Sequence, residues 1–90
     1  MFAGGRRIRT RYFTLIAAPG DRAPRLGMAI GRRCASRAVV RNRMKRMIRE
    51  TFRQAELPAC DVVVTARPGV GDISRQALRD DLRCGLGKLR

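Results

Sequence analysis

The sequence predicts a small α+β domain, and three observations lead to this fold class. Residues 10–18 and 26–30 are rich in large apolar residues and are separated by turn-forming residues, as two strands would be. Residues 60–67 contain a run of three valines. Residues 38–53 and 73–89 space their apolar side chains three or four positions apart, which indicates helices. The expected order is β-β-α-β-α, with the helices packed on a small β-sheet.

The length and the charge of the chain restrict its function. Ninety residues suffice for a single domain, 1–90, whose core is thin because so short a chain buries only about 60–65% of its unfolded surface. The chain carries 21 Lys and Arg residues against 7 Asp and Glu residues, so that its net charge is +14. Such a charge repels itself in a free domain and favours a polyanionic partner such as nucleic acid.

The first half of the chain predicts a hairpin after an irregular start. Residues 1–9 are rich in Gly and Arg and are expected to be irregular. The strands at 10–18 and 26–30 flank the turn signal Pro19-Gly20-Asp21, which predicts that they pair antiparallel as a hairpin. A connection follows, in which Ser36 is expected to be the N-cap of the next helix.

The second half predicts a central strand between two helices. The basic helix is expected to end near Pro58, because the residue before a proline disfavours helix. The valine run alternates little with polar residues, which predicts a central strand that is covered on both faces. The last helix is expected over residues 73–89, with Asp72 or Ser74 as its cap.

Residues 38–53 predict a helix with two different faces. One face is apolar and the other is cationic. Glu50 lies four residues after Arg46 and can neutralise only part of the positive charge of this helix. Phe52, at the edge of the apolar side, is expected in the core. A solvated charged surface is the alternative, but the separation of signs favours contact with nucleic acid. The apolar side consists of Val40, Met44, Met47, Ile48, Thr51 and Ala55, and the cationic side of Asn42, Lys45, Arg46, Arg49 and Arg53.

The chain lacks the residues that several kinds of catalysis require. The chain has no histidine, which excludes Ser–His and Cys–His catalysis. Asp80 and Asp81 are neighbours that project about 100° apart on a helix, so they do not form a paired acid and base. The three cysteines, Cys34, Cys60 and Cys84, have wide spacings that do not match a zinc site, and we expect three separate buried thiols.

The location of the protein follows from segments that the sequence lacks. No apolar run approaches the ~18 residues that a membrane-spanning helix needs, and the first residues lack the apolar core of a signal peptide. A protein that lies on a membrane surface is disfavoured, because the apolar face of the basic helix fits a core. We therefore expect a cytoplasmic protein that has no membrane partner.

Three segments of the chain closely resemble the protein subunit of bacterial ribonuclease P. The Arg-Asn-Arg core, followed by Lys-Arg and Arg-Glu, is the signature of that family. An isolated Arg-Asn-Arg has no diagnostic value, whereas three blocks in the same order are specific. The segments are 25–33 (RLGMAIGRR), 38–53 (AVVRNRMKRMIRETFR) and 61–67 (DVVVTAR).

This resemblance implies an α+β fold with an unusual left-handed β-α-β crossover around the basic helix, in a single RNA-binding domain over residues 1–90. It implies two partners, the catalytic RNA of ribonuclease P and precursor tRNA, and no small-molecule substrate. The complex removes the 5′ leader of precursor tRNA. The chemistry is expected in the RNA, which holds Mg²⁺, so that the protein has no catalytic residue and binds no metal by itself.

The resemblance also implies which residues contact RNA. Family members usually begin with a further stretch that forms a first helix, and this chain begins near the end of that region. A leader cleft is expected to involve Phe2, Tyr12 and Ile16, with Ile16 where the family often has an aromatic residue. The residues expected to bind RNA are Arg32, Arg33, Arg41, Asn42, Arg43, Lys45, Arg46, Arg49, Arg53 and Arg67.

A second class of function stays open at this point. A small basic RNA-binding protein without associated catalysis, such as a ribosomal or nucleoid protein, would carry the same charge. Reconstitution with the catalytic RNA separates the two classes, because only a ribonuclease P subunit would assist cleavage of precursor tRNA at low Mg²⁺.

Overall fold

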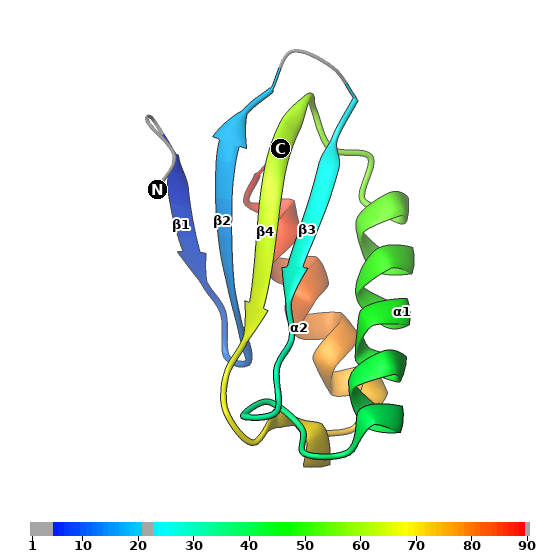
Figure 1. Ribbon diagram of the computed structural model, residues 1–90. Coiled ribbons are helices and arrows are strands. Elements are labelled where there is room, and N and C mark those ends of the chain that lie inside the picture. The colour runs from blue at the N-terminus through cyan, green and yellow to red at the C-terminus, as the bar shows by residue number, and fades with distance from the viewer. Residues whose placement is uncertain (1–4, 21–22, 90) are drawn as a thin grey trace.

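The computed structural model describes residues 5–20 and 23–89, which form an α+β fold (Figure 1). The predicted elements occur in the predicted order, but one strand precedes them. The prediction that residues 1–9 are irregular is wrong for Arg6–Arg9, because these residues pair with the next strand. The elements are β1 (Arg6–Arg9), β2 (Phe13–Pro19), β3 (Arg25–Ala29), α1 (Ala38–Gln54), β4 (Cys60–Ala66), a 3₁₀ turn (Val70–Asp72) and α2 (Arg75–Gly87).

The strands form one sheet in the order β1-β2-β4-β3. The predicted hairpin of the first two strand segments is wrong, because β4 inserts between β2 and β3. β4 pairs antiparallel with β2 and parallel with β3, so the valine-rich strand has a partner on both edges. After β2, the Gly20 N–H donates to the Ala59 carbonyl at 3.2 Å, just before the start of β4. A Cβ on Gly20 would lie 3.2 Å from the Cα of Cys60, which explains the glycine.

The connection from β3 through α1 to β4 is a crossover between adjacent parallel strands. In Figure 1 the chain leaves the lower end of β3, rises through α1 on the face of the sheet that α2 also covers, and descends in β4. Followed in this direction, the crossover is left-handed. About 98% of such connections are right-handed. The unusual topology that the family resemblance implies is therefore present.

The core lies on the face of the sheet that α1 and α2 cover. Val62 and Val64 point to this face and are 1% and 0% exposed, whereas Val63 points to the opposite face and is half-buried. The prediction that β4 is covered on both faces is therefore wrong for the described part of the chain. The largest fully buried side chains are Phe13, Leu15, Met47, Ile48, Leu82 and Leu86.

The helix ends differ in how they are capped. The prediction that Ser36 is the N-cap of α1 is wrong, because Arg37 takes this position and makes no side-chain hydrogen bond there. α1 ends at Gln54, shortly before the predicted limit at Pro58, and Glu56 then turns the chain with a left-handed φ of 51°. At α2 the predicted cap is confirmed, because the Ser74 side chain accepts a hydrogen bond from the Ala77 N–H at 3.2 Å.

The three cysteines are free thiols in different environments. Cys34 and Cys60 are buried, but Cys84 is exposed on α2, so the prediction of three buried thiols is wrong for Cys84. Burial raises the pKa of the Cys60 thiol, and the neighbouring Asp61 carboxylate adds to the effect. Among the described residues, no helix has the length and apolar character that crossing a bilayer requires.

Candidate nucleic-acid interface

The two predicted faces of α1 are present. Met44, Met47, Ile48 and Thr51 are buried, and the Thr51 hydroxyl donates to the Met47 carbonyl at 2.8 Å, so this one polar group of the buried side has a partner. The opposite side carries what we call the cationic row, whose members are exposed except for the half-buried Lys45. The cationic row consists of Asn42, Lys45, Arg46, Arg49 and Arg53.

The cationic row is not neutralised within the domain. The carboxylate of Glu50 lies 3.6 Å from the guanidinium of Arg75 on α2, and it forms no ion pair with Arg46. The only other ion pair within 4.0 Å among the described residues joins Arg25 to Asp61, at 3.9 Å. The row therefore presents its charge to solvent, where a polyanion would relieve the repulsion between neighbouring cations.

The two arginines of the Arg-Asn-Arg sequence lie apart from this row. The Arg41 Nη1 donates to the carbonyls of Ala35 and Ser36, at 2.9 Å each, and so holds the connection before α1 in place. Arg43 lies on the flank of α1 that faces α2, where it lines a hollow together with Arg75. The three residues of the motif thus differ in position, and Arg41 has a structural task besides any contact with RNA.

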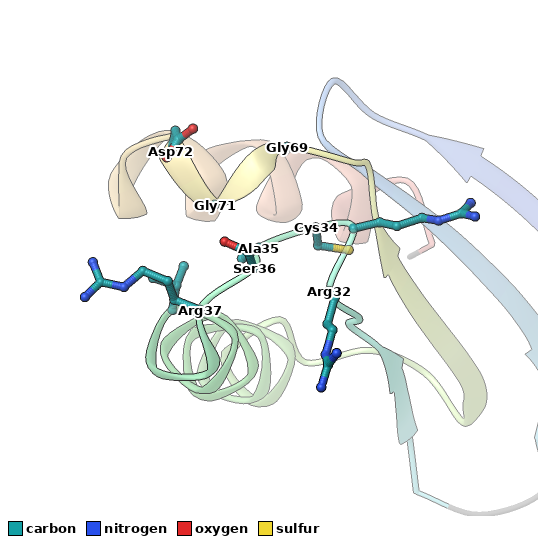
Figure 2. A pocket seen from close by; sticks show the side chains of 10 residues that line it. Arg32, Cys34, Ala35, Ser36, Arg37, Gly69, Gly71 and Asp72 are labelled. Carbon is teal, nitrogen blue, oxygen red and sulfur yellow. The ribbon is translucent and has the colours of Figure 1, made fainter.

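A second group of cations lies where β3 and β4 end and α1 begins. The Gly69 N–H donates to the Arg33 carbonyl at 2.8 Å, and the Gly71 N–H donates to the Cys34 carbonyl at 2.9 Å. A Cβ on Gly71 would lie 2.7 Å from the Cβ of Ala35, so the two loops touch closely. The loops border a hollow of about 270 Å³, and Figure 2 shows Arg32 and Arg37 extending from it in different directions.

Arg67 joins this end of the sheet from β4. It is exposed, and its backbone N–H donates to the Tyr12 carbonyl at 2.9 Å. Arg32 and Arg33 are exposed as well. The predicted RNA-binding residues therefore form two groups, the cationic row along α1 and an end group of Arg32, Arg33 and Arg67.

The face of the sheet opposite the helices, which we call the open face, holds one of the three predicted cleft residues. Ile16 is half-buried there and lies in register with Val63 on one side and Arg7 on the other. Tyr12 lies at the β1–β2 turn, with the Arg11 guanidinium 5.5 Å from the centre of its ring. Phe2 lies outside the described residues.

The arginines of β1 were missed from the sequence. Arg7 and Arg9 are exposed and alternate with the buried Ile8, so they point to the open face beside β2. The alternation of Arg7, Ile8 and Arg9 is the signal that could have identified this strand.

Asp81 was also missed, although it fixes the β1–β2 turn. Its carboxylate accepts hydrogen bonds from the Thr10 hydroxyl at 2.5 Å, from the Arg11 N–H at 3.1 Å and from the Tyr12 N–H at 2.9 Å. No local pattern could have shown this, because the donors lie about 70 positions away in the sequence. Asp81 therefore determines where Arg11 and Tyr12 lie.

This arrangement can bind a polyanion on several surfaces. Among the described residues, no group of three or more His, Cys, Asp or Glu side chains lies close enough together to hold a metal ion. The side chains of the cationic row and the end group carry guanidiniums, one lysine amine and one amide, which can donate hydrogen bonds to phosphate oxygens.

Known proteins are similar to this chain in sequence and in fold. A family model described as Ribonuclease P matches residues 1–90. The ribonuclease P protein component of Idiomarina loihiensis is 45% identical over 76 residues, which cover 81% of this chain and 61% of that protein. The component of Nitrosococcus oceani is 46% identical over 87 residues, which cover 93% of this chain and 71% of that protein.

Two solved structures resemble the fold closely. The Staphylococcus aureus RNase P protein has a TM-score of 0.82 at 28% identity, covering 92% of this chain and 79% of that one. The Thermotoga maritima RNase P protein has a TM-score of 0.81 at 26% identity, covering 96% and 84%. The chain spans about 61–71% of the length of the two curated relatives described above. From its sequence and its fold, the chain belongs to the ribonuclease P protein family.

Proposed function

We propose that the protein acts as the protein component of ribonuclease P, which removes the 5′ leader of precursor tRNA. The observation that carries this proposal is the cationic row of α1, which has no carboxylate partner in the described structure. Guanidiniums at intervals of about one helical turn can contact successive phosphates of an RNA backbone. In this proposal the row binds the catalytic RNA, and the end group of Arg32, Arg33 and Arg67 extends that surface.

The open face of the sheet is the proposed surface for the 5′ leader. Ile16 and Val63 offer an apolar centre, and Arg7 and Arg9 provide cations at its β1 side. An extended single strand can lie on such a surface with its phosphates near the arginines and its bases over the apolar centre. The aliphatic Ile16 cannot stack on a base as an aromatic ring does, so we expect this face to bind the leader without strong base preference.

The chemical step is assigned to the RNA subunit, and Mg²⁺ is expected to be bound by RNA. The protein contributes positive charge, which reduces the repulsion between the catalytic RNA and the precursor tRNA and so lowers the Mg²⁺ concentration that cleavage requires. This function places the protein in the cytoplasm.

The test is reconstitution with the catalytic RNA from the same organism. Cleavage of precursor tRNA would be measured at low and at high Mg²⁺, with and without the protein. We expect the protein to raise the rate chiefly at low Mg²⁺, and a double variant, Arg46→Ala with Arg49→Ala, to lose most of this gain. Binding to RNA without any gain in rate would instead favour the second class, a basic RNA-binding protein without associated catalysis.

A further inference from the structure

We propose that the groove between α1 and β3 binds one unstacked nucleotide of a single-stranded RNA segment. This inference rests on the proposed function, because it gives the cationic row a second wall and a ligand of defined chemistry. It adds a base-binding site to a surface for which charge alone predicts only contact with phosphates.

The groove lies on the flank of α1 that faces away from α2. One hollow, of about 550 Å³, is lined there by residues of both walls, and a second follows toward the lower end of β3 in Figure 1, where it includes Met28 and Lys45. We call the first hollow the β3–α1 groove. Its lining consists of Pro24, Leu26, Arg46, Arg49, Glu50, Phe52 and Arg53.

The lining of the groove has an apolar part and a cationic part, which suit the base and the phosphate of a nucleotide. Leu26 and Phe52 are half-buried, so each packs against the core and still exposes part of its surface to the groove. Arg46, Arg49 and Arg53 belong to the cationic row and border the same hollow. An aromatic ring can stack on a base and guanidiniums can contact its phosphate, which is how many proteins bind single strands.

The other wall adds unpaired backbone groups. β3 is the last strand of the sheet among the described residues, so no further strand pairs with its outer edge. The outward N–H and C=O groups of such an edge can form hydrogen bonds with a base or a ribose. Gly27 and Ala29 are exposed and carry small side chains, which leaves this backbone accessible.

A single strand fits these observations better than other occupants. A duplex keeps its bases stacked inside, so it would contact the arginines but not Leu26 and Phe52. An acidic peptide would satisfy the arginines, but the net charge of +14 and the family of the chain favour RNA. The one carboxylate in the lining, Glu50, lies 3.6 Å from Arg75 and is partly neutralised by it.

The absence of tryptophan from the chain allows a direct test. A Phe52→Trp variant would carry the only indole of the protein, next to the proposed base. Gln54→Trp is the matched control, because Gln54 is exposed on α1 and does not line the groove. Each variant would be titrated with a single-stranded RNA of about ten nucleotides, within the usual range of site sizes, and with an RNA duplex of equal charge.

We expect the single strand to quench the indole fluorescence of the Phe52→Trp variant and to leave that of the Gln54→Trp variant nearly unchanged. The duplex should quench neither variant strongly. A Phe52→Leu variant, which keeps an apolar side chain but loses the ring, should bind the single strand about fivefold or more weakly. Equal quenching of the two indole variants, or stronger quenching by the duplex, would overturn the proposal.

A measurement on the unmodified protein keeps the test valid if a variant does not fold. The same single strand with 4-thiouridine would be crosslinked, and the modified residues identified by mass spectrometry. Adducts on Leu26 or Phe52 support the groove, and adducts confined to other surfaces contradict it. If crosslinking contradicts the groove while the protein still assists cleavage, only this inference fails. If the groove binds RNA but cleavage is not assisted, the proposed function fails.

Discussion

The two helices lie on the same face of the sheet but use their charges in different ways. α1 carries six cations and one carboxylate, and its cationic row has no ion-pair partner in the described structure. α2 carries three cations and two carboxylates, and the Asp81 carboxylate accepts three hydrogen bonds from the β1–β2 turn. The N-terminus of α2 has a side-chain cap, whereas that of α1 has none. The Asp81 carboxylate of α2 thus stabilises the fold, while the charge of the cationic row on α1 remains available for a ligand.

The largest expected effect concerns the buried side of α1, because this side packs the helix against the core and so positions the cationic row. Met44 is 4% exposed, and Met44→Asp would place a carboxylate in the core without a partner. We expect this to cost more than about 4 kcal/mol and to abolish cooperative unfolding. Circular dichroism during heating would show it. A cooperative transition at the parent temperature would contradict the burial of this side.

The next effect tests whether α2 stabilises the fold through Asp81. Asp81→Ala removes the acceptor of three hydrogen bonds, and we expect a loss of about 2 kcal/mol in the free energy of unfolding. Asp80→Ala is the matched control, because it removes the same charge from an exposed neighbour. Denaturant titrations would compare the two. Similar losses in both variants would mean that general charge, rather than the turn contact, matters.

A smaller effect on binding energy is expected for single members of the cationic row. Arg46→Ala and Arg49→Ala should each reduce the slope of log affinity against log salt by about one contact, without a change in stability. Arg79→Ala and Arg83→Ala on α2 remove equal charge and serve as controls. Binding to the catalytic RNA would be measured over a range of salt concentrations. If the α1 and α2 variants had equal salt slopes, the cationic row would contact RNA no more than the arginines of α2 do.

The smallest effect is expected at the ion pair that links the helices. The side chains of Arg75 and Glu50 are 66% and 51% exposed, so Glu50→Gln should change stability by less than about 1 kcal/mol. It should slightly strengthen RNA binding, because it removes the one carboxylate of α1. Arg75→Gln breaks the same pair but keeps that carboxylate, so it should bring no gain. Thermal melts would measure the change in stability of both variants, and RNA titrations would measure their change in affinity.

Local pattern predicted most of the elements but not their pairing. The spacing of apolar residues located α1, including its buried Met44, Met47, Ile48 and Thr51, because helical periodicity depends on neighbouring residues. The hairpin prediction failed because the turn signal at Pro19-Gly20 shows where the chain bends, whereas strand neighbours are set by contacts distant in sequence.

The candidate site was predictable in part for the same reason. The cationic row follows from periodicity, and its members were named from the sequence. Two features depend on how α1 lies against α2 and β3 and could not be predicted from local pattern. Glu50 pairs with Arg75 rather than with Arg46, and Leu26 and Phe52 line the same groove. Arg7 and Arg9 carried a strand signal that the glycine-rich start obscured.

The insertion of β4 at the centre of the sheet also has a consequence during synthesis. The strands on either side of it leave the ribosome first, and each keeps an unpaired edge until residue 66 has emerged. The nascent chain therefore exposes its arginine-rich helix before the sheet that positions it can form. Because such distant pairing slows folding, we expect nearby RNA to meet this segment before the domain is complete.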